Sequence, residues 1–239
     1  MTDGPTIRRI KQLAIPPAWS DVWICPDGSG HLQAAGTDDA GRRQSIYHPR
    51  WRERRDKEKF ERVVGFAELL PKVRRTVSKD LALPGLPQAR VLACSIRLLD
   101  QAFFRIGSEA YAERNGSFGL ATLRRSHVTL GRSRVAFDYT AKSGKRRHQE
   151  IRDPDVVAII RMLVRRRGGG RDLLAFDEDG RWRDVRSADI NRYLKQLAGD
   201  AYTAKDFRTW HATVLAAVSG RTDTGCGCGH AACDLAMSI

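Results

Sequence analysis

In the first fifty residues, apolar positions come in short runs that turn-forming sequences separate. One run covers residues 22–25 and is followed by Pro-Asp-Gly-Ser-Gly, which favours a tight turn, and the next run covers residues 31–34. A second turn at 37–41 leads into the run 42–48. The pattern therefore predicts a small antiparallel sheet in the N-terminal part of the chain.

Further along the chain, apolar residues recur at three- and four-residue spacing, which is typical of amphipathic helices. The run at 88–106 has the broadest apolar face and is expected to lie at the centre of its domain. Ser187 is placed as the N-cap of one of the other helices. The spacing predicts helices over residues 51–70, 88–106, 154–167, 187–198 and 203–219.

A strand pair and a break complete the picture. Residues 128–130 and 135–139 read as strands, and the second of them runs into a turn at 141–145. The stretch 79–87 holds two prolines and one glycine, which helices and strands tolerate poorly, so we place the domain boundary there. The expected organisation is α+β: an antiparallel β-rich domain at 1–78, a mostly helical domain at 79–220 and a tail at 221–239.

Charge narrows the choice of partner. The chain has 239 residues, 42 of them Lys or Arg and 28 Asp or Glu, for a formal net charge of +14. Such an excess favours a polyanion, because each cation placed against a phosphate releases condensed counterions. Nucleic acid is the leading partner, and a basic but otherwise ordinary surface is the alternative. We expect a cytoplasmic protein, because neither a membrane-spanning apolar stretch nor a secretory leader is evident.

Three segments carry side chains suited to holding a phosphate: residues 104–107 at the end of a predicted helix, 142–145 in a turn, and 205–210 at the start of a helix. Each alone has an ordinary explanation as a capping arginine, a solvated turn or a helix start of mixed charge. Two well-separated arginines with a lysine between them can nevertheless surround one phosphate. The arginines would neutralise its oxygens and the lysine would protonate a leaving oxygen.

These segments and several others resemble one family, the bacterial and poxvirus-like type IB DNA topoisomerases. The resemblance covers roughly residues 8–218, with all segments in the family's order. The matching segments are Ile-Pro-Pro-Ala-Trp at 15–19, Val-Trp-Ile-Cys-Pro at 22–26, His-Leu-Gln-Ala at 31–34, Tyr-His-Pro-Arg-Trp-Arg at 47–52, Phe-Arg-Ile-Gly at 104–107, Asn-Gly-Ser-Phe-Gly-Leu at 115–120 and Lys-Asp-Phe-Arg-Thr-Trp at 205–210.

The resemblance implies an enzyme in which a tyrosine attacks a phosphodiester of duplex DNA, forming a 3′-phosphotyrosyl link and a free 5′-hydroxyl. The nicked duplex swivels and is resealed without ATP or a metal cofactor. At the matching positions, Arg105 and Arg208 resemble the arginines that stabilise the pentacoordinate phosphorane. Lys142 resembles the general acid for the 5′ oxygen, and Lys205 resembles an auxiliary lysine.

The same resemblance implies a division of labour between the domains. The first becomes a DNA clamp, and the second a catalytic domain of the topoisomerase IB and tyrosine recombinase type. Gln44, Tyr47 and Tyr111 match positions that contact the DNA, whereas Ser45 departs from the family's usual aromatic residue. Duplex DNA is the expected partner, and we expect the protein to act as a monomer associated with the nucleoid.

The nucleophile is the largest departure from the family pattern. Tyrosines occur only at 47, 111, 139, 193 and 202, and none follows Arg208, where the family places its nucleophile. His211 comes too early to replace the family's additional phosphate-binding residue. The tail offers four zinc-ligand side chains at tight spacing, but we favour a disordered end from truncation or a frameshift over a metal site. Those side chains are Cys226, Cys228, His230 and Cys233.

The sequence thus predicts a type IB DNA topoisomerase that relaxes supercoils, in a chain that lacks the nucleophilic tyrosine and is expected to be inactive alone. Two alternatives stay open. One is a clamp that binds duplex DNA without cutting it, which the missing tyrosine favours. The other is a tyrosine recombinase, which uses similar arginine and lysine chemistry, although the segment at 15–19 favours the topoisomerase.

Overall fold

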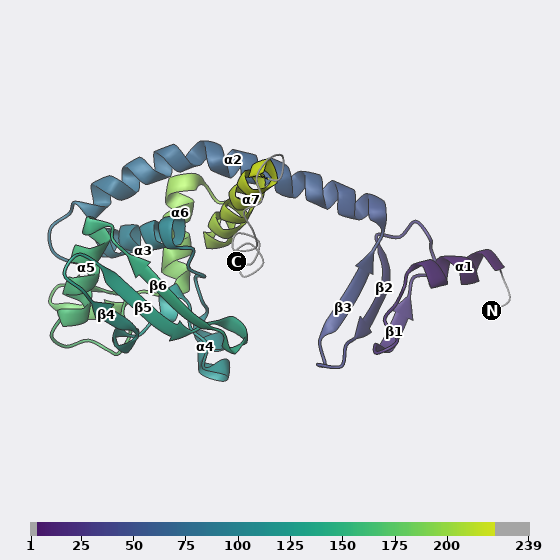
Figure 1. The fold of residues 1–239 in the computed structure, drawn as a ribbon, viewed down its shortest axis with the longest axis horizontal. Helices are drawn as coiled ribbons and strands as arrows, with labels where there is room; N and C mark the ends of the chain where they lie inside the picture. The colour runs from purple at the N-terminus through teal and green to yellow at the C-terminus, as the bar shows by residue number, and fades with distance from the viewer. Residues whose placement is uncertain (1–3, 223–239) are drawn as a thin grey trace. The chain divides into compact units, whose positions relative to one another are not determined.

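The computed structural model describes residues 4–222 (Figure 1). Contacts within the chain divide it into two units, which meet between Arg62 and Val63. The architecture is α+β as predicted, with a small antiparallel sheet first and a mostly helical unit after it. The division by contacts falls inside a long helix, and not at 78–79 where the prolines and glycine place the domain boundary.

The first unit is built on a three-stranded antiparallel sheet in the order β1 (Ser20–Ile24), β2 (Leu32–Thr37), β3 (Arg43–Tyr47), preceded by helix α1 (Gly4–Gln12). The central strand supplies the buried residues Ala34 and Ala35. Arg9 fastens α1 to the sheet by donating hydrogen bonds to the carbonyl of Cys25 at 2.7 Å and to the side chain of Gln33 at 2.8 Å. The predicted hairpin and second turn are both confirmed.

Helix α2 (Pro49–Leu81) extends eleven residues beyond the predicted end at Leu70. Pro71 lies inside it, although proline removes a helical hydrogen bond. The apolar spacing continues past the proline, and these side chains are buried in the core of the second unit: Phe66, Leu70, Val73, Val77 and Leu81. Burial of this stripe explains why the helix continues where local preference predicts that it stops.

The segment after α2 is an ordered connection and not a loose linker. Leu86 is buried, and its carbonyl accepts a hydrogen bond from the backbone of Asp177 at 3.0 Å. The guanidinium of Arg90 donates to the carbonyls of Leu81 at 2.9 Å and Gly85 at 2.7 Å. The prolines and the glycine therefore end a helix inside one packed unit, which is why contacts show no division there.

Helix α3 (Gln88–Ala102) is the centre of the second unit, as the sequence predicts. It contacts α5 (Pro154–Arg165), α6 (Ser187–Ala198), α7 (Ala204–Thr222), β6 and β7. The antiparallel sheet β4 (Val128–Leu130), β5 (Val135–Thr140) and β6 (Arg146–Ile151) packs beside it in Figure 1. The hairpin β7 (Ala175–Glu178) and β8 (Arg181–Asp184) and the short helix α4 (Glu109–Asn115) were not predicted.

The predicted helices at 154–167, 187–198 and 203–219 correspond to α5, α6 and α7; the bounds of α6 agree, and the ends of the other two differ by at most three residues. Most of the expected tail at 221–239, including the four zinc-ligand side chains, lies outside the described residues. Among the helices of residues 4–222, none combines the length and the apolar character needed to cross a bilayer.

Candidate functional site

Arg105 lies in an extended segment directly after α3. The helix ends at Phe103, whose φ of 55° is left-handed and turns the chain away from the helix axis. Backbone hydrogen bonds then hold the segment. The carbonyl of Arg105 accepts from Leu120 at 2.8 Å, and that of Ile106 accepts from Ala121 at 2.8 Å. The backbone on both sides of the Arg105 side chain is therefore fixed.

Two glycines allow these segments to come together. Gly107 has a φ of +81°, and a Cβ on Gly119 would lie 2.5 Å from the Cα of Gly107. A contact that close is impossible for any residue with a side chain unless the backbone moves. The Phe-Arg-Ile-Gly and Asn-Gly-Ser-Phe-Gly-Leu segments of the sequence therefore form one structural unit around Arg105.

Lys142 lies in the tight connection between β5 and β6. The backbone of Ala141 donates to the carbonyl of Lys145 at 2.7 Å, which closes the turn. Ser143 and Gly144 have φ values of 67° and 73°, the left-handed conformations that a tight turn requires. Lys142 is exposed. The turn thus fixes the backbone position of Lys142, while its side chain is accessible from solvent.

Lys205 and Arg208 lie in the first turns of α7. The backbone and hydroxyl of Thr203 donate to the carboxylate of Asp206 at 2.8 and 3.1 Å. The backbone of Ala204 donates to the side chain of Asn191 on α6 at 2.9 Å. The start of α7 is therefore held from within and from a neighbouring helix, and the three-residue spacing places Lys205 and Arg208 on one side of it.

Tyr111 is on α4. The carboxylate of Glu109, on the same helix, connects α4 to α6. Glu109 accepts hydrogen bonds from the backbone and hydroxyl of Ser187 at 2.8 and 2.9 Å. Burial alone would raise the pKa of Glu109, but these hydrogen bonds outweigh it and lower that pKa. The predicted role of Ser187 as N-cap is wrong, because Arg186 is the N-cap and Ser187 is the first helical residue.

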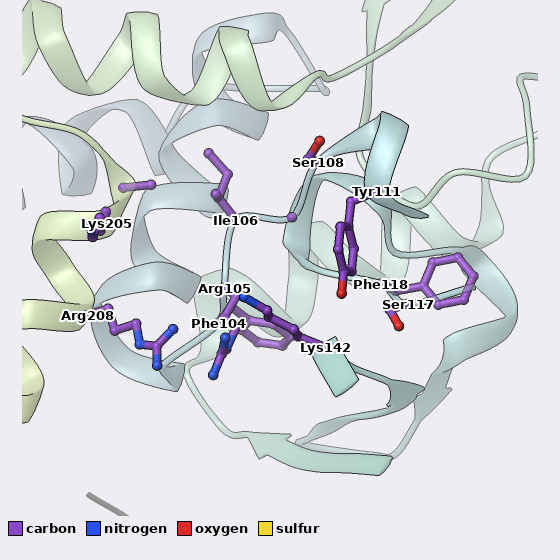
Figure 2. Close-up of a pocket in the computed structure, with 12 residues that line it drawn as sticks. Phe104, Arg105, Ile106, Ser108, Tyr111, Ser117, Phe118, Lys142, Lys205 and Arg208 are labelled. Atoms are coloured by element: carbon purple, nitrogen blue, oxygen red, sulfur yellow. The ribbon is translucent and has the colours of Figure 1, made fainter. Parts of the chain in front are cut away.

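These side chains from four parts of the sequence line one pocket of about 370 Å³. Figure 2 shows Arg105, Lys142 and Arg208 directed toward a common region, with Tyr111 and Phe118 on another side of the pocket. Within the described part of the chain, no Asp or Glu lines it. Its residues are Phe104, Arg105, Ile106, Gly107, Ser108, Tyr111, Ser117, Phe118, Lys142, Ala204, Lys205 and Arg208.

Neighbouring positive charges change the pKa values of side chains at this site. Burial lowers the pKa of Arg208, and the positive charges of Arg105 and Arg147 lower it further. Burial raises the pKa of Tyr139 to about 12, against the opposing effect of Arg147 and Arg105. Cations whose charges disfavour one another in a partly buried site are typical of a site for an anion, which would relieve the repulsion.

Gln44 and Tyr47 belong to the first unit. The side chain of Gln44 donates to the carboxylate of Asp38 at 2.8 Å. Tyr47 stacks on Trp51 with ring centroids 4.2 Å apart and an angle of 17° between the planes. Both predicted DNA contacts are thus on or beside the sheet, each with a neighbour that restricts its side chain.

Of the five tyrosines, Tyr111 lines the pocket. The hydroxyl of Tyr139 donates to Gln149 at 3.1 Å, and that of Tyr193 donates to Asp80 at 2.5 Å. Tyr202 packs on Phe66, with ring centroids 5.3 Å apart. Tyr47 is in the first unit. His211 does not line the pocket either, in agreement with its early place in the sequence.

The geometry agrees with what comparison with known proteins finds. Residues 48–219 match the family described as the catalytic core of eukaryotic DNA topoisomerase I. The chain belongs to the type IB DNA topoisomerases. Residues 1–38 match the N-terminal domain of bacterial DNA topoisomerase IB, so this type IB topoisomerase is of the bacterial and poxvirus-like kind.

Three relatives show how far the similarity extends. DNA topoisomerase 1B of Acanthamoeba polyphaga mimivirus is 34% identical over 211 residues, which are 87% of this chain and 63% of the relative. DNA topoisomerase I of monkeypox virus is 21% identical over 144 residues, covering 59% and 46% of the two chains. DNA topoisomerase 1 of Mycosarcoma maydis is 24% identical over 177 residues, covering 66% and 17%. The matched part thus falls short of two thirds of each relative.

Sequence reasoning singled out five residues of the pocket and missed the rest. Ser117 and Phe118 belong to a segment that was noted for its resemblance but was given no role. Ile106 likewise belongs to a quoted segment, Phe-Arg-Ile-Gly at 104–107, without a role of its own, and Ser108 lies just outside that segment. The glycines at 107 and 119 were the available signal, because paired glycines in two matching segments are consistent with close backbone approach.

Proposed function

We propose that this type IB topoisomerase binds duplex DNA and holds one backbone phosphodiester in the pocket of Arg105, Lys142, Lys205 and Arg208. The observation that carries the proposal is that four cations separated by up to 103 residues line one pocket without an acidic residue among its described lining. A phosphodiester supplies one negative charge of suitable size for a pocket lined by these four cations.

The roles follow from the chemistry of phosphoryl transfer. Arg105 and Arg208 present planar guanidinium groups, which suit two oxygens of a phosphorane and gain strength as negative charge develops there. Lys142 carries a proton on a flexible stem from a fixed turn, which suits a general acid for the 5′ oxygen. Lys205 adds positive charge one helical turn before Arg208. Tyr111, at the edge of the pocket, contacts the strand.

The full reaction requires a nucleophile. In this family a tyrosine forms the 3′-phosphotyrosyl intermediate, and in the 239 residues no tyrosine follows Arg208. Tyr139 and Tyr193 use their hydroxyls in hydrogen bonds away from the pocket. The chain by itself therefore binds and polarises a phosphodiester but forms no covalent adduct, and supercoil relaxation needs a tyrosine from a further segment.

A clamp that binds duplex DNA without cutting it is the second candidate, and the positions of the tyrosines favour it for this chain taken alone. The two candidates differ in what a further segment restores. A clamp stays inactive when a topoisomerase C-terminal segment is added, whereas the proposed enzyme gains relaxation. Both predict a DNA-binding monomer that works at the nucleoid in the cytoplasm.

The experiment compares the chain with a version extended in frame by the C-terminal segment of a type IB topoisomerase. Duplex affinity is measured by fluorescence anisotropy across a salt series, and cleavage by plasmid relaxation and by trapping of covalent protein–DNA adducts. We expect affinity to fall steeply with salt for both versions, because cations displace counterions from DNA. Relaxation is expected only for the extended version.

Two variants complete this design. Tyr111→Phe tests whether the one tyrosine of the pocket acts as a nucleophile, and we expect it to leave relaxation by the extended version in place. Arg192→Ala removes an exposed cation of α6 that pairs with Asp189, and serves as the control for general loss of charge. Relaxation by the unextended chain, or binding that ignores salt, would contradict the proposal.

A further inference from the structure

A cluster of three ionisable side chains, two of them buried and the third, Arg74, 53% exposed, lies next to the pocket without lining it. Arg74 of α2 donates to both carboxylate oxygens of Asp100, at 2.8 and 2.9 Å. The Nε2 atom of His211 on α7 lies 3.7 Å from the same carboxylate. Asp100 and His211 expose only 7% and 9% of their side chains. The three residues, called here the Asp100 link, join helices α2, α3 and α7.

The link meets both arginine-bearing segments of the pocket. Asp100 lies in the last turn of α3, and the ring of His211 packs edge-on against Phe103, with centroids 4.6 Å apart. Phe103 is the left-handed residue at which the chain leaves the helix for Arg105. On α7, His211 follows Arg208 by three residues, about one helical turn. A single buried contact therefore connects the backbone that precedes Arg105 with the helix that carries Arg208.

The like charges of the pocket give a physical reason for a contact that connects its two arginine-bearing segments. Arg105 and Arg208 repel one another, and nothing acidic lines the pocket within the described residues. Like charges on separate elements disfavour one another's close approach. Holding them at the separation that a phosphate requires needs a restraint that is independent of the ligand.

Stability alone is a poor explanation for the cluster. Arg74 exposes 53% of its side chain, and an ion pair with one partner in solvent contributes little to stability. The Nδ1 atom of His211 is buried and has no hydrogen-bond partner among the described residues, which adds a cost. An apolar side chain would fill this place without that cost. Polar contacts differ from apolar ones in that they fix a specific geometry.

We propose that Arg74, Asp100 and His211 are positioning residues, which hold Arg105 and Arg208 at the separation needed to bind one phosphate. The inference rests on the proposed function of the pocket as a phosphodiester site. None of the three residues lines the pocket. The link acts through the end of α3 and the first turns of α7.

The test compares two substitutions of one residue. His211→Gln keeps an N–H group that can reach Asp100, whereas His211→Leu removes it and keeps an apolar side chain of similar size. The Nε–Hε signals of Arg105 and Arg208 are followed by NMR in the full chain without ligand. We expect His211→Leu to shift and broaden both signals and His211→Gln to leave them close to those of the unsubstituted protein.

The second readout uses inorganic phosphate as the probe. Titration is expected to move both arginine signals together in the unsubstituted protein and in His211→Gln. In His211→Leu we expect phosphate affinity to fall about tenfold, which corresponds to about 1.4 kcal/mol. Arg97→Ala is the control, because Arg97 is on α3, the helix of Asp100, is mostly buried and pairs with Asp153 at 3.6 Å without lining the pocket. It should change neither readout.

The outcomes separate the two proposals. If phosphate moves neither arginine signal in the unsubstituted protein, the pocket is not a phosphate site, yet the ligand-free signals still test the link. If His211→Leu leaves both arginine signals unchanged, or His211→Gln disturbs them equally, the link only supports the fold and the inference is overturned. Should His211→Leu not fold, Asp100→Asn, which keeps the shape and removes the charge, is expected to give the same two changes.

Discussion

In the first unit, Gln44 and Tyr47 lie on or beside a three-stranded sheet with a short buried strand, whereas in the second unit Arg105, Lys142 and Arg208 surround a pocket on a continuous core. The first pair is restricted by single neighbours, Asp38 and Trp51. The pocket residues are held by backbone hydrogen bonds, paired glycines and helix caps.

Under the proposed function, the first pair contacts a duplex and the pocket holds one phosphodiester, and these two tasks make different demands on the side chains. Contacts that hold a duplex act together with many others, so each tolerates some looseness. Groups that stabilise a transition state act only at the correct place, and a displacement of about 1 Å can reduce the rate on the order of a hundredfold. We therefore expect substitutions to have larger and more specific effects in the second unit. Four pairs of variants test that expectation.

The largest contrast is in catalysis. In the chain extended with a family C-terminal segment, Arg105→Ala or Arg208→Ala is expected to slow plasmid cleavage by about 10²–10³-fold, because each removes charge stabilisation from the transition state. Duplex affinity should change little, since one phosphate contact among many is lost. Gln44→Ala should have the opposite profile, with a modest loss of affinity and near-normal cleavage at saturation. Equal effects on both quantities for all three variants would contradict the contrast.

The next contrast concerns two arginines that bind backbone carbonyls. Arg166 is buried and donates to the carbonyls of Leu163 at 2.7 Å and Leu173 at 2.8 Å, and also to that of Asp172. Arg166→Met should lower the free energy of unfolding by about 3 kcal/mol, because several buried carbonyls lose their donors. Arg9→Met in the first unit should cost about 1 kcal/mol. Urea unfolding measures both, and a larger loss for Arg9→Met would reverse the ranking.

Acid dependence gives a third contrast, between Asp100 and Asp38. Burial alone would raise the pKa of Asp100, but the hydrogen bonds from Arg74 and the nearby His211 side chain lower it to about 2. A lowered pKa stabilises the fold above the ordinary carboxyl pKa, and this stabilisation disappears as the pH falls toward 2. The free energy of unfolding should fall between about pH 5 and pH 2. We expect this fall to be about 2 kcal/mol smaller in Asp100→Asn than in the unsubstituted protein.

Asp38 serves as the comparison in the same titration. Hydrogen bonds from Arg42 lower the pKa of Asp38, but this pair is at the surface of the first unit, where solvent weakens it. Asp38→Asn should change the acid dependence of unfolding only slightly. An unaltered acid profile for Asp100→Asn would show that Asp100 is not the residue responsible.

The smallest contrast uses two glycines. A Cβ on Gly119 would meet backbone atoms of Gly107 at 2.5 Å, whereas one on Gly36 would meet the ring of Trp19 at 2.8 Å. A side chain can move aside more easily than a backbone can. Gly119→Ala should therefore cost about 1–3 kcal/mol and disturb Arg105, and Gly36→Ala should cost less. Thermal unfolding together with the Arg105 NMR signal checks both, and a larger cost at Gly36 would refute this explanation.

Much of the fold can be predicted from periodicity, and the misses have identifiable causes. The spacing of apolar residues locates α3, α5, α6 and α7 because each buries one face. The prediction ends α2 too early, because proline by local preference ends a helix at Pro71. Burial of Val73 and Val77 stabilises the helix beyond that residue. The β7–β8 hairpin was missed because charged residues make up most of its two strands, which leaves too few apolar positions for an alternating pattern.

What the sequence by itself determined is the family, through the basic excess and the order of the matching segments, and it also supplied the arginines and lysines that we propose hold a phosphate. These follow from residue types and spacings, which are local properties. Only the tertiary structure decided that Arg105, Lys142, Lys205, Arg208 and Tyr111 line one pocket, and that Asp100 and His211 lie buried beside it. Contacts across more than a hundred residues depend on how α3 and α7 pack, and no local pattern encodes that packing.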